Sequence, residues 1–80
     1  MGIFHYLIFA ENAVAARRCA QEKGIPYHMY SYVMSTDILH RCDPFLTQIV
    51  FDETWHNHDK SAELFTVAFN RGLISRESLV

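Results

Sequence analysis

The chain has 80 residues, of which half are hydrophobic, and a formal net charge of −2 at pH 7. A chain of this length forms one domain and buries roughly 60–65% of its unfolded surface, enough for one small core. Its few Lys and Arg residues form no basic stripe, so we expect no nucleic-acid partner. No apolar run reaches the ~20 residues of a membrane span, and no signal peptide is visible, so no membrane association is expected.

The only two cysteines, Cys19 and Cys42, form no CxxC pair. Isolated cysteines are typical of a reducing compartment, and we interpret each as a small buried hydrophobe rather than half of a disulfide. We therefore expect a cytoplasmic protein, and no motif indicates a cofactor.

The first predicted element is a strand over residues 3–10, IFHYLIFA. Such a nearly continuous apolar run is typical of a strand that is covered on both faces. A helix is predicted over residues 13–23, with Asn12 as its N-cap and Gly24 as the residue that ends it.

A second strand is predicted over residues 27–34, because YHMYSYVM is aromatic and β-favouring. Its weak alternation indicates an edge strand with half-exposed tyrosines. Ser35, Thr36 or Asp37 then caps one or two helical turns, which Pro44 ends.

The third strand is predicted over residues 47–53, TQIVFDE. The last helix is predicted over residues 60–71, with Asp59 or Asn57 as its cap and Gly72 as its end.

Strands and helices alternate along the chain, which predicts a single α/β domain over residues 1–80 with a βαβαβα order. We expect a small, Rossmann-like sheet of three parallel strands with right-handed crossovers. Strand order 2-1-3 is preferred, because the first strand is the most apolar and therefore central; order 3-2-1 is the alternative. Residues 73–80 are expected to form a short tail that packs through Leu73 and Ile74.

Open parallel sheets bind ligands beyond the carboxyl ends of their strands. The sequence places a set of polar candidates for ligand binding at this edge: Glu11, Asn12, Thr36, Asp52, Glu53 and Thr54. One hypothesis for the function is therefore a binder of a small, nucleotide-like molecule.

The segment IVFDE, residues 49–53, resembles the Walker B strand of P-loop nucleotidases. The resemblance would give Asp52 a role in Mg²⁺ binding and Glu53 a role in positioning water. This chemistry also needs a Gly-rich loop that ends in Lys-Ser/Thr, whereas AENAVAA follows the first strand. Nucleotide hydrolysis is therefore not expected.

The segment DETWHNHD, residues 52–59, raises the hypothesis of a metal-dependent hydrolase with His56, His58 and Asp52 as ligands. Two histidines at i and i+2 share a face only on extended backbone, and no HExxH motif or cysteine pair supplies further ligands. We favour solvent-facing histidines in a turn, and we predict neither a metal nor a catalytic residue.

Aromatic residues provide the candidates for partner binding: Tyr27, Tyr30, Tyr32 and Trp55. Tyr and Trp concentrate binding energy at protein interfaces, although Trp55 can equally be a core residue that covers the last helix. A three-stranded sheet has few elements to cover both faces, so we expect a homodimer. The leading hypothesis is a non-enzymatic interaction module that binds a protein partner.

The whole-chain pattern is similar to small phage-encoded α/β proteins of unassigned function. The likeness consists of a short strand-helix unit, then YSYVMSTDILH, then the apolar strand that leads into IVFDETW. It implies a phage or prophage origin and no particular activity. Asp52 and Glu53 stand where small residues would be expected, and no functional residue is carried over.

Overall fold

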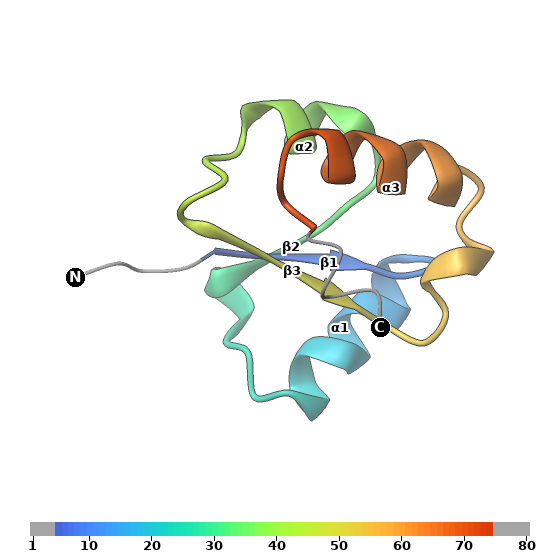
Figure 1. Cartoon of the computed structure of the whole chain (residues 1–80). Coiled ribbons are helices and arrows are strands. Elements are labelled where there is room, and N and C mark those ends of the chain that lie inside the picture. The colour runs from blue at the N-terminus through green and yellow to red at the C-terminus, as the bar shows by residue number, and fades with distance from the viewer. Residues whose placement is uncertain (1–4, 75–80) are drawn as a thin grey trace.

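Three parallel strands form the centre of the molecule, and helices pack on both faces of the sheet (Figure 1). The structure is a computed structural model that describes residues 5–74. Its principal elements are β1 (His5–Phe9), α1 (Ala13–Glu22), β2 (Tyr30–Tyr32), α2 (Thr36–Arg41), β3 (Thr47–Phe51) and α3 (Ser61–Asn70). The sheet order is β2-β1-β3, which confirms the predicted α/β fold and the preferred order 2-1-3.

Strand β1 is central because it is the most apolar. Tyr6 pairs with Tyr30 of β2, and His5 pairs with Thr47 of β3, both in parallel register. The side chains of residues 7–10 are all buried. The predicted strand over residues 3–10 is thus confirmed for residues 5–9, while residues 3 and 4 lie outside the described part.

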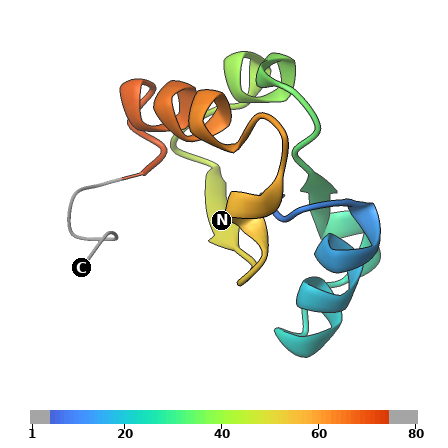
Figure 2. The same cartoon turned by 90° about the vertical axis from the view of Figure 1, so that its right-hand side faces the viewer.

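The two faces of the sheet carry different cores. Helix α1 presents small residues to the sheet, and Ala16 and Cys19 are buried beside Ile8. Helices α2 and α3 cover the opposite face, where Leu7 and Phe9 pack with larger side chains such as Leu39 and Leu64. Figure 2 shows α1 on the β2 side of the sheet and α3 on the β3 side. On the α1 face of β3, Gln48 is exposed and Val50 is partly buried against the core on that face.

The boundaries of α1 agree closely with the sequence prediction. Asn12 is the N-cap, and its Oδ1 accepts a hydrogen bond of 2.9 Å from the backbone N of Ala15. Gly24 follows the helix with φ +71°, and Gly72 follows α3 with φ +75°; both lie in the left-handed region that glycine adopts most readily.

The second strand is shorter than predicted. Tyr27–Met29 form a 3₁₀ turn, in which Met29 N donates to Pro26 O across 2.9 Å, and only Tyr30–Tyr32 form a strand. Local β propensity was misleading for Tyr27–Met29, which form a 3₁₀ turn, whereas Tyr30–Tyr32 pair with Tyr6, Leu7 and Ile8 of β1. The third strand likewise ends at Phe51, because Asp52 begins a turn that its own side chain stabilises.

The predicted caps of the last helix are wrong. Helix α3 follows Lys60, which provides no side-chain cap, and Asn57 lies in a second 3₁₀ turn, Trp55–Asn57. After α3, Leu73 and Ile74 pack on the core as predicted. The remainder of the predicted tail, residues 75–80, lies outside the described residues. None of the helices within residues 5–74 has the length and apolar character needed to cross a membrane.

Candidate functional site

The carboxyl ends of the strands bring part of the predicted ligand-binding set together. The backbone N of Asp52 donates to Phe9 O across 2.8 Å, which joins the end of β3 to the end of β1. The backbone N of Glu11 donates to Thr54 Oγ1 across 3.3 Å. Glu11, Asp52 and Thr54 therefore meet where the sequence predicted a site.

Asp52 is the only buried charged residue in the described part, with 5% of its surface exposed. Its Oδ2 accepts hydrogen bonds from Thr54 Oγ1 and, at 3.1 Å, from the backbone N of Thr54. Arg18 Nη2 lies 3.8 Å from the same oxygen. Burial alone would raise the pKa of the Asp52 carboxyl, but the hydrogen bonds from Thr54 and the charge of Arg18 leave this pKa lowered.

Glu11 is joined to a residue that the sequence interpretation assigned another role. Asn57 Nδ2 donates to Glu11 Oε2 across 3.2 Å. Asn57 had been predicted as a helix cap, and its contact with a residue 46 positions away depends on the turn after β3, which gives no local sequence signal.

The remaining ligand candidates do not join this group. Asn12 uses its side chain to cap α1, and Glu53 is exposed. Thr36 is the first residue of α2, and its side chain is not the cap of that helix. The polar residues of this edge thus bond mainly to one another, an arrangement that holds two loops together.

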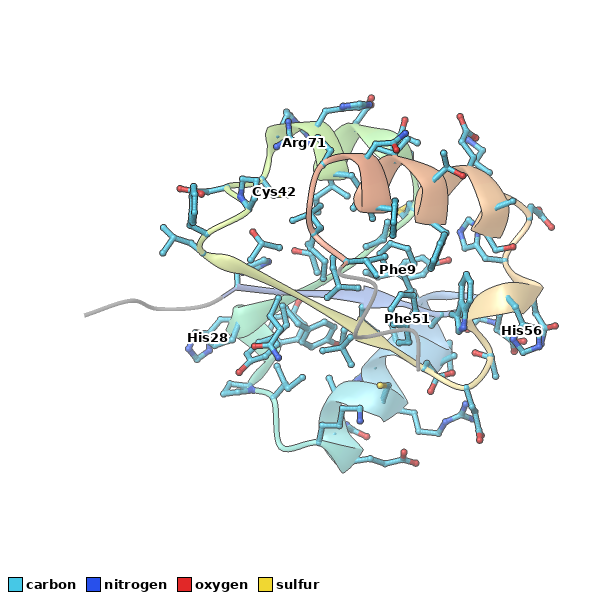
Figure 3. The ribbon with its side chains drawn as sticks, in the orientation of Figure 1. Phe9, His28, Cys42, Phe51, His56 and Arg71 are labelled. Carbon is cyan, nitrogen blue, oxygen red and sulfur yellow. The ribbon has the colours of Figure 1, made fainter. Side chains whose placement is uncertain are left out.

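The histidine segment forms no metal centre in residues 5–74, where no three His, Cys, Asp or Glu side chains are placed to hold a metal ion. His56 lies at the carboxyl edge and is exposed (Figure 3). His58 Nδ1 accepts a hydrogen bond of 3.0 Å from Lys60 N, and its ring lies 6.0 Å from that of Tyr32. Burial, and secondly the charge of Asp59, raise the pKa of Tyr32.

The four predicted partner-binding aromatics are divided between the two faces of the sheet. Trp55 packs in the core beneath α3: its ring centroid lies 5.0 Å from that of Phe51 and 5.6 Å from that of Phe65. Tyr30 and Tyr32 instead pack on the α1 side. Trp55 therefore has the core role that the sequence left open, and it does not share a surface with the tyrosines.

Tyr27 is the most exposed of these aromatics, with 84% of its surface accessible. Its ring meets that of Tyr30 edge to face at a centroid distance of 6.3 Å. The two rings border a hollow of about 180 Å³, which is completed by Arg17, Ala20, Gln21 and Ile25. We name this surface, formed by Arg17, Gln21, Ile25, Tyr27 and Tyr30, the Tyr27 patch.

A contact that the sequence analysis missed lies at the opposite end of the sheet. His5 Nε2 and Ser31 Oγ are 2.8 Å apart, on neighbouring strands. His5 also lines an open cavity of about 530 Å³ between α2 and the amino ends of β1 and β3, with Leu7, Ile38 and Leu46 among its apolar walls. Only the register of β1 and β2 brings His5 to Ser31, so no sequence motif marks the pair.

The surroundings of both cysteines indicate structural roles. Burial, followed by the charge of Asp52, raises the pKa of the Cys19 thiol, which disfavours the reactive thiolate. The thiol of Cys42 donates to Leu39 O across 3.4 Å.

Comparison with known proteins gives no match for the chain among protein-family models, curated proteins or solved structures. The site must therefore be interpreted from its geometry alone.

Proposed function

We propose that this protein is a non-enzymatic interaction module of phage or prophage origin, which acts in the bacterial cytoplasm by binding a protein partner. The observation that carries the proposal is the Tyr27 patch, in which Tyr27 stands almost fully exposed against Tyr30. Tyr and Arg are the residue types that, with Trp, dominate binding energy at protein interfaces. An exposed tyrosine held against a second ring also loses little side-chain freedom when it binds.

The hollow beside Tyr27 supports a protein partner rather than a small ligand. Its volume of about 180 Å³ is below the roughly 300 Å³ at which small-molecule pockets begin. A single side chain from a partner fits such a hollow, with the guanidinium of Arg17 beside it.

The alternative, a nucleotide-like ligand at the carboxyl edge, has weaker support. Asp52 Oδ2 is engaged by Thr54, and Glu11 Oε2 is engaged by Asn57. A ligand would have to displace bonds that hold the loops after β1 and β3 together.

Capture from bacterial lysate with four tagged proteins tests the proposal: wild type, Tyr27→Ala, Arg17→Ala and Phe45→Ala. Phe45 is the matched control, because it is 89% exposed and does not belong to the Tyr27 patch. We expect a protein that wild type and Phe45→Ala both retain and that Tyr27→Ala loses. Capture that is unchanged by Tyr27→Ala and by Arg17→Ala would contradict the proposed binding surface.

We also propose that two copies of the chain associate. The partial exposure of β3 within the described residues and the high apolar content support this part of the proposal. Light scattering of wild type at tens of micromolar is the test: a dimer mass is expected, and a clean monomer would contradict self-association.

A further inference from the structure

The outer edge of β3 has backbone groups that pair with no other strand within residues 5–74. His5 N donates to Leu46 O, and Asp52 N donates to Phe9 O, at the two ends of the β1–β3 ladder. Because bonding residues alternate along a parallel strand, the backbone groups of Gln48 and Val50 face β1. Those of Thr47, Ile49 and Phe51 point outward, to a side where no strand within residues 5–74 pairs.

Within the described residues, this edge lacks most of the features that protect strand edges from association. Natural edges are blunted by charged residues, Pro, bulges or very short strands. The sequence of β3 is TQIVF, which has five residues and neither charge nor Pro. By contrast, the opposite edge strand β2 has only three residues.

The same edge is complementary to itself. In an antiparallel arrangement centred on Ile49, Ile49 faces its own copy, and Thr47 faces Phe51 of the second copy. All these residues point outward, so each facing pair exchanges two backbone hydrogen bonds. The pairs are β-branched and aromatic, the types that stabilise cross-strand contacts.

Charge is also compatible with this arrangement. If the antiparallel pairing centred on Ile49 is continued beyond the ends of β3, Asp52 of one copy lies opposite Leu46 of the other. At the next position, Glu53 lies opposite Phe45. No carboxylate of this segment therefore opposes another carboxylate. Two identical edges paired about a two-fold axis close the assembly at a dimer.

The two faces of this edge differ: the α3 face carries apolar side chains, and the other face carries polar and apolar ones. Phe65 of α3 lies 6.4 Å from Phe51 between ring centroids, and Phe69 stacks on Phe65 at 6.3 Å. Helix α3 lies over the β3 side of the sheet (Figure 2). On the other face, a hollow of about 390 Å³ follows β3 and is lined by Lys23 and Gln48 as well as by Tyr6, Ile25 and Val50.

We infer that two copies of the chain pair through antiparallel β3 strands, centred on Ile49, to form one continuous six-stranded sheet. This inference rests on the self-association proposed above and specifies its interface. The pairing strands do not include the Tyr27 patch, which lies beside β2 at the other edge, although Ile25 lines the hollows on both sides.

The first test adds a charge to the edge without touching the core. Gln48 is exposed, and Gln48→Lys places two lysines close together across the proposed interface, on the face that already carries Lys23. We expect the dimer dissociation constant to rise by at least about tenfold, because juxtaposed like charges are costly at interfaces. His28→Lys, an exposed site beside β2, is the charge-matched control and should leave the dimer unchanged.

The second test reads the register directly. In the proposed arrangement, Cα atoms of facing hydrogen-bonded residues are about 5.5 Å apart, within disulfide range. Under mild oxidation Ile49→Cys should therefore form a 49–49 disulfide, identified by peptide mass mapping, whereas Thr47→Cys should form no 47–47 disulfide.

The outcomes separate this inference from self-association itself. A wild-type monomer overturns both. A dimer that survives Gln48→Lys overturns only the β3 interface, as does a 47–47 disulfide in place of the 49–49 one. Since Ile49 also contacts the core, the Gln48→Lys result decides the question if Ile49→Cys fails to fold.

Discussion

Arg71 joins the ends of two helices: its Nη2 donates a hydrogen bond of 2.9 Å to the backbone oxygen of Cys42 (Figure 3). Arg71 is the C-cap of α3, and Cys42 is the C-cap of α2. The guanidinium therefore lies at helix C-termini, where a positive charge is favourable. Its Nε is buried and has no hydrogen-bond partner among the described residues, which reduces the net gain.

We predict that Arg71→Ala lowers the free energy of unfolding by about 1–2 kcal/mol, because the bond to Cys42 O and the packing of the side-chain stem are both lost. Arg71→Met should cost less, since it keeps an apolar stem and removes the unpaired Nε. Urea unfolding of both variants measures the difference. Equal losses for Ala and Met would show that the stem and the unpaired nitrogen are unimportant.

The acid dependence of stability should report on Asp52. Its pKa in the folded protein is lowered from the ordinary 3.8, so its charged form stabilises the fold above about pH 4, and this contribution is lost as the pH falls through the folded pKa. We predict that Asp52→Asn is about 1 kcal/mol less stable than wild type at pH 7 and that the gap narrows toward pH 3.

Urea titrations at a series of pH values measure this gap. The control is Glu53→Gln, which removes the neighbouring exposed carboxylate and should change stability at pH 7 by less than about 0.5 kcal/mol. Arg18 is 52% exposed on its side chain, so its ion pair with Asp52 contributes little, and Arg18→Ala should have a smaller effect than Asp52→Asn. A gap that stays constant with pH would contradict the assigned role of the charge.

Trp55 should be a structural residue. We predict that Trp55→Ala costs about 2–3 kcal/mol, because it removes a ring packed against Phe51 and Phe65. Phe45→Ala, at an exposed aromatic, should change stability by less than about 0.5 kcal/mol. Chemical denaturation followed by circular dichroism compares the two, and similar values would contradict the core assignment.

Chelation should leave the fold unaffected. A structural zinc contributes on the order of 10 kcal/mol to folding, so its removal is conspicuous. We predict that EDTA leaves the melting temperature of the wild type unchanged. The melting temperature of the double variant His56→Ala, His58→Ala should likewise be the same with and without EDTA. A large fall in melting temperature with EDTA would revive the metal hypothesis for residues 52–59.

The sequence was most informative where a local signal and the global fold agree. The apolar run of β1 predicted its central place, and Asn12, Gly24 and Gly72 marked helix boundaries that the structure confirms. These features depend on hydrophobic burial and on backbone geometry, both of which are encoded within a few residues.

The sequence was least informative where a residue has competing local roles or a distant partner. Tyr27 was assigned to a strand by its β propensity, but it lies in a 3₁₀ turn. Asn57 has the composition of a cap, yet it bonds to Glu11 across the carboxyl edge. The contact of His5 with Ser31 requires the register of two strands, which a single sequence does not specify.

The parallel sheet also determines how the chain must fold. Within the described residues, every strand pair joins segments that are distant in the sequence. Tyr6 pairs with Tyr30 and His5 with Thr47, and no hairpin joins two neighbouring strands. Loop closure therefore precedes every sheet contact, which slows folding relative to helical domains of the same size. The small-residue face of α1 packs on β1 and adjoins it in the chain, so this contact can form before β2 and β3 complete the sheet and reduces the apolar surface that β1 exposes in the meantime.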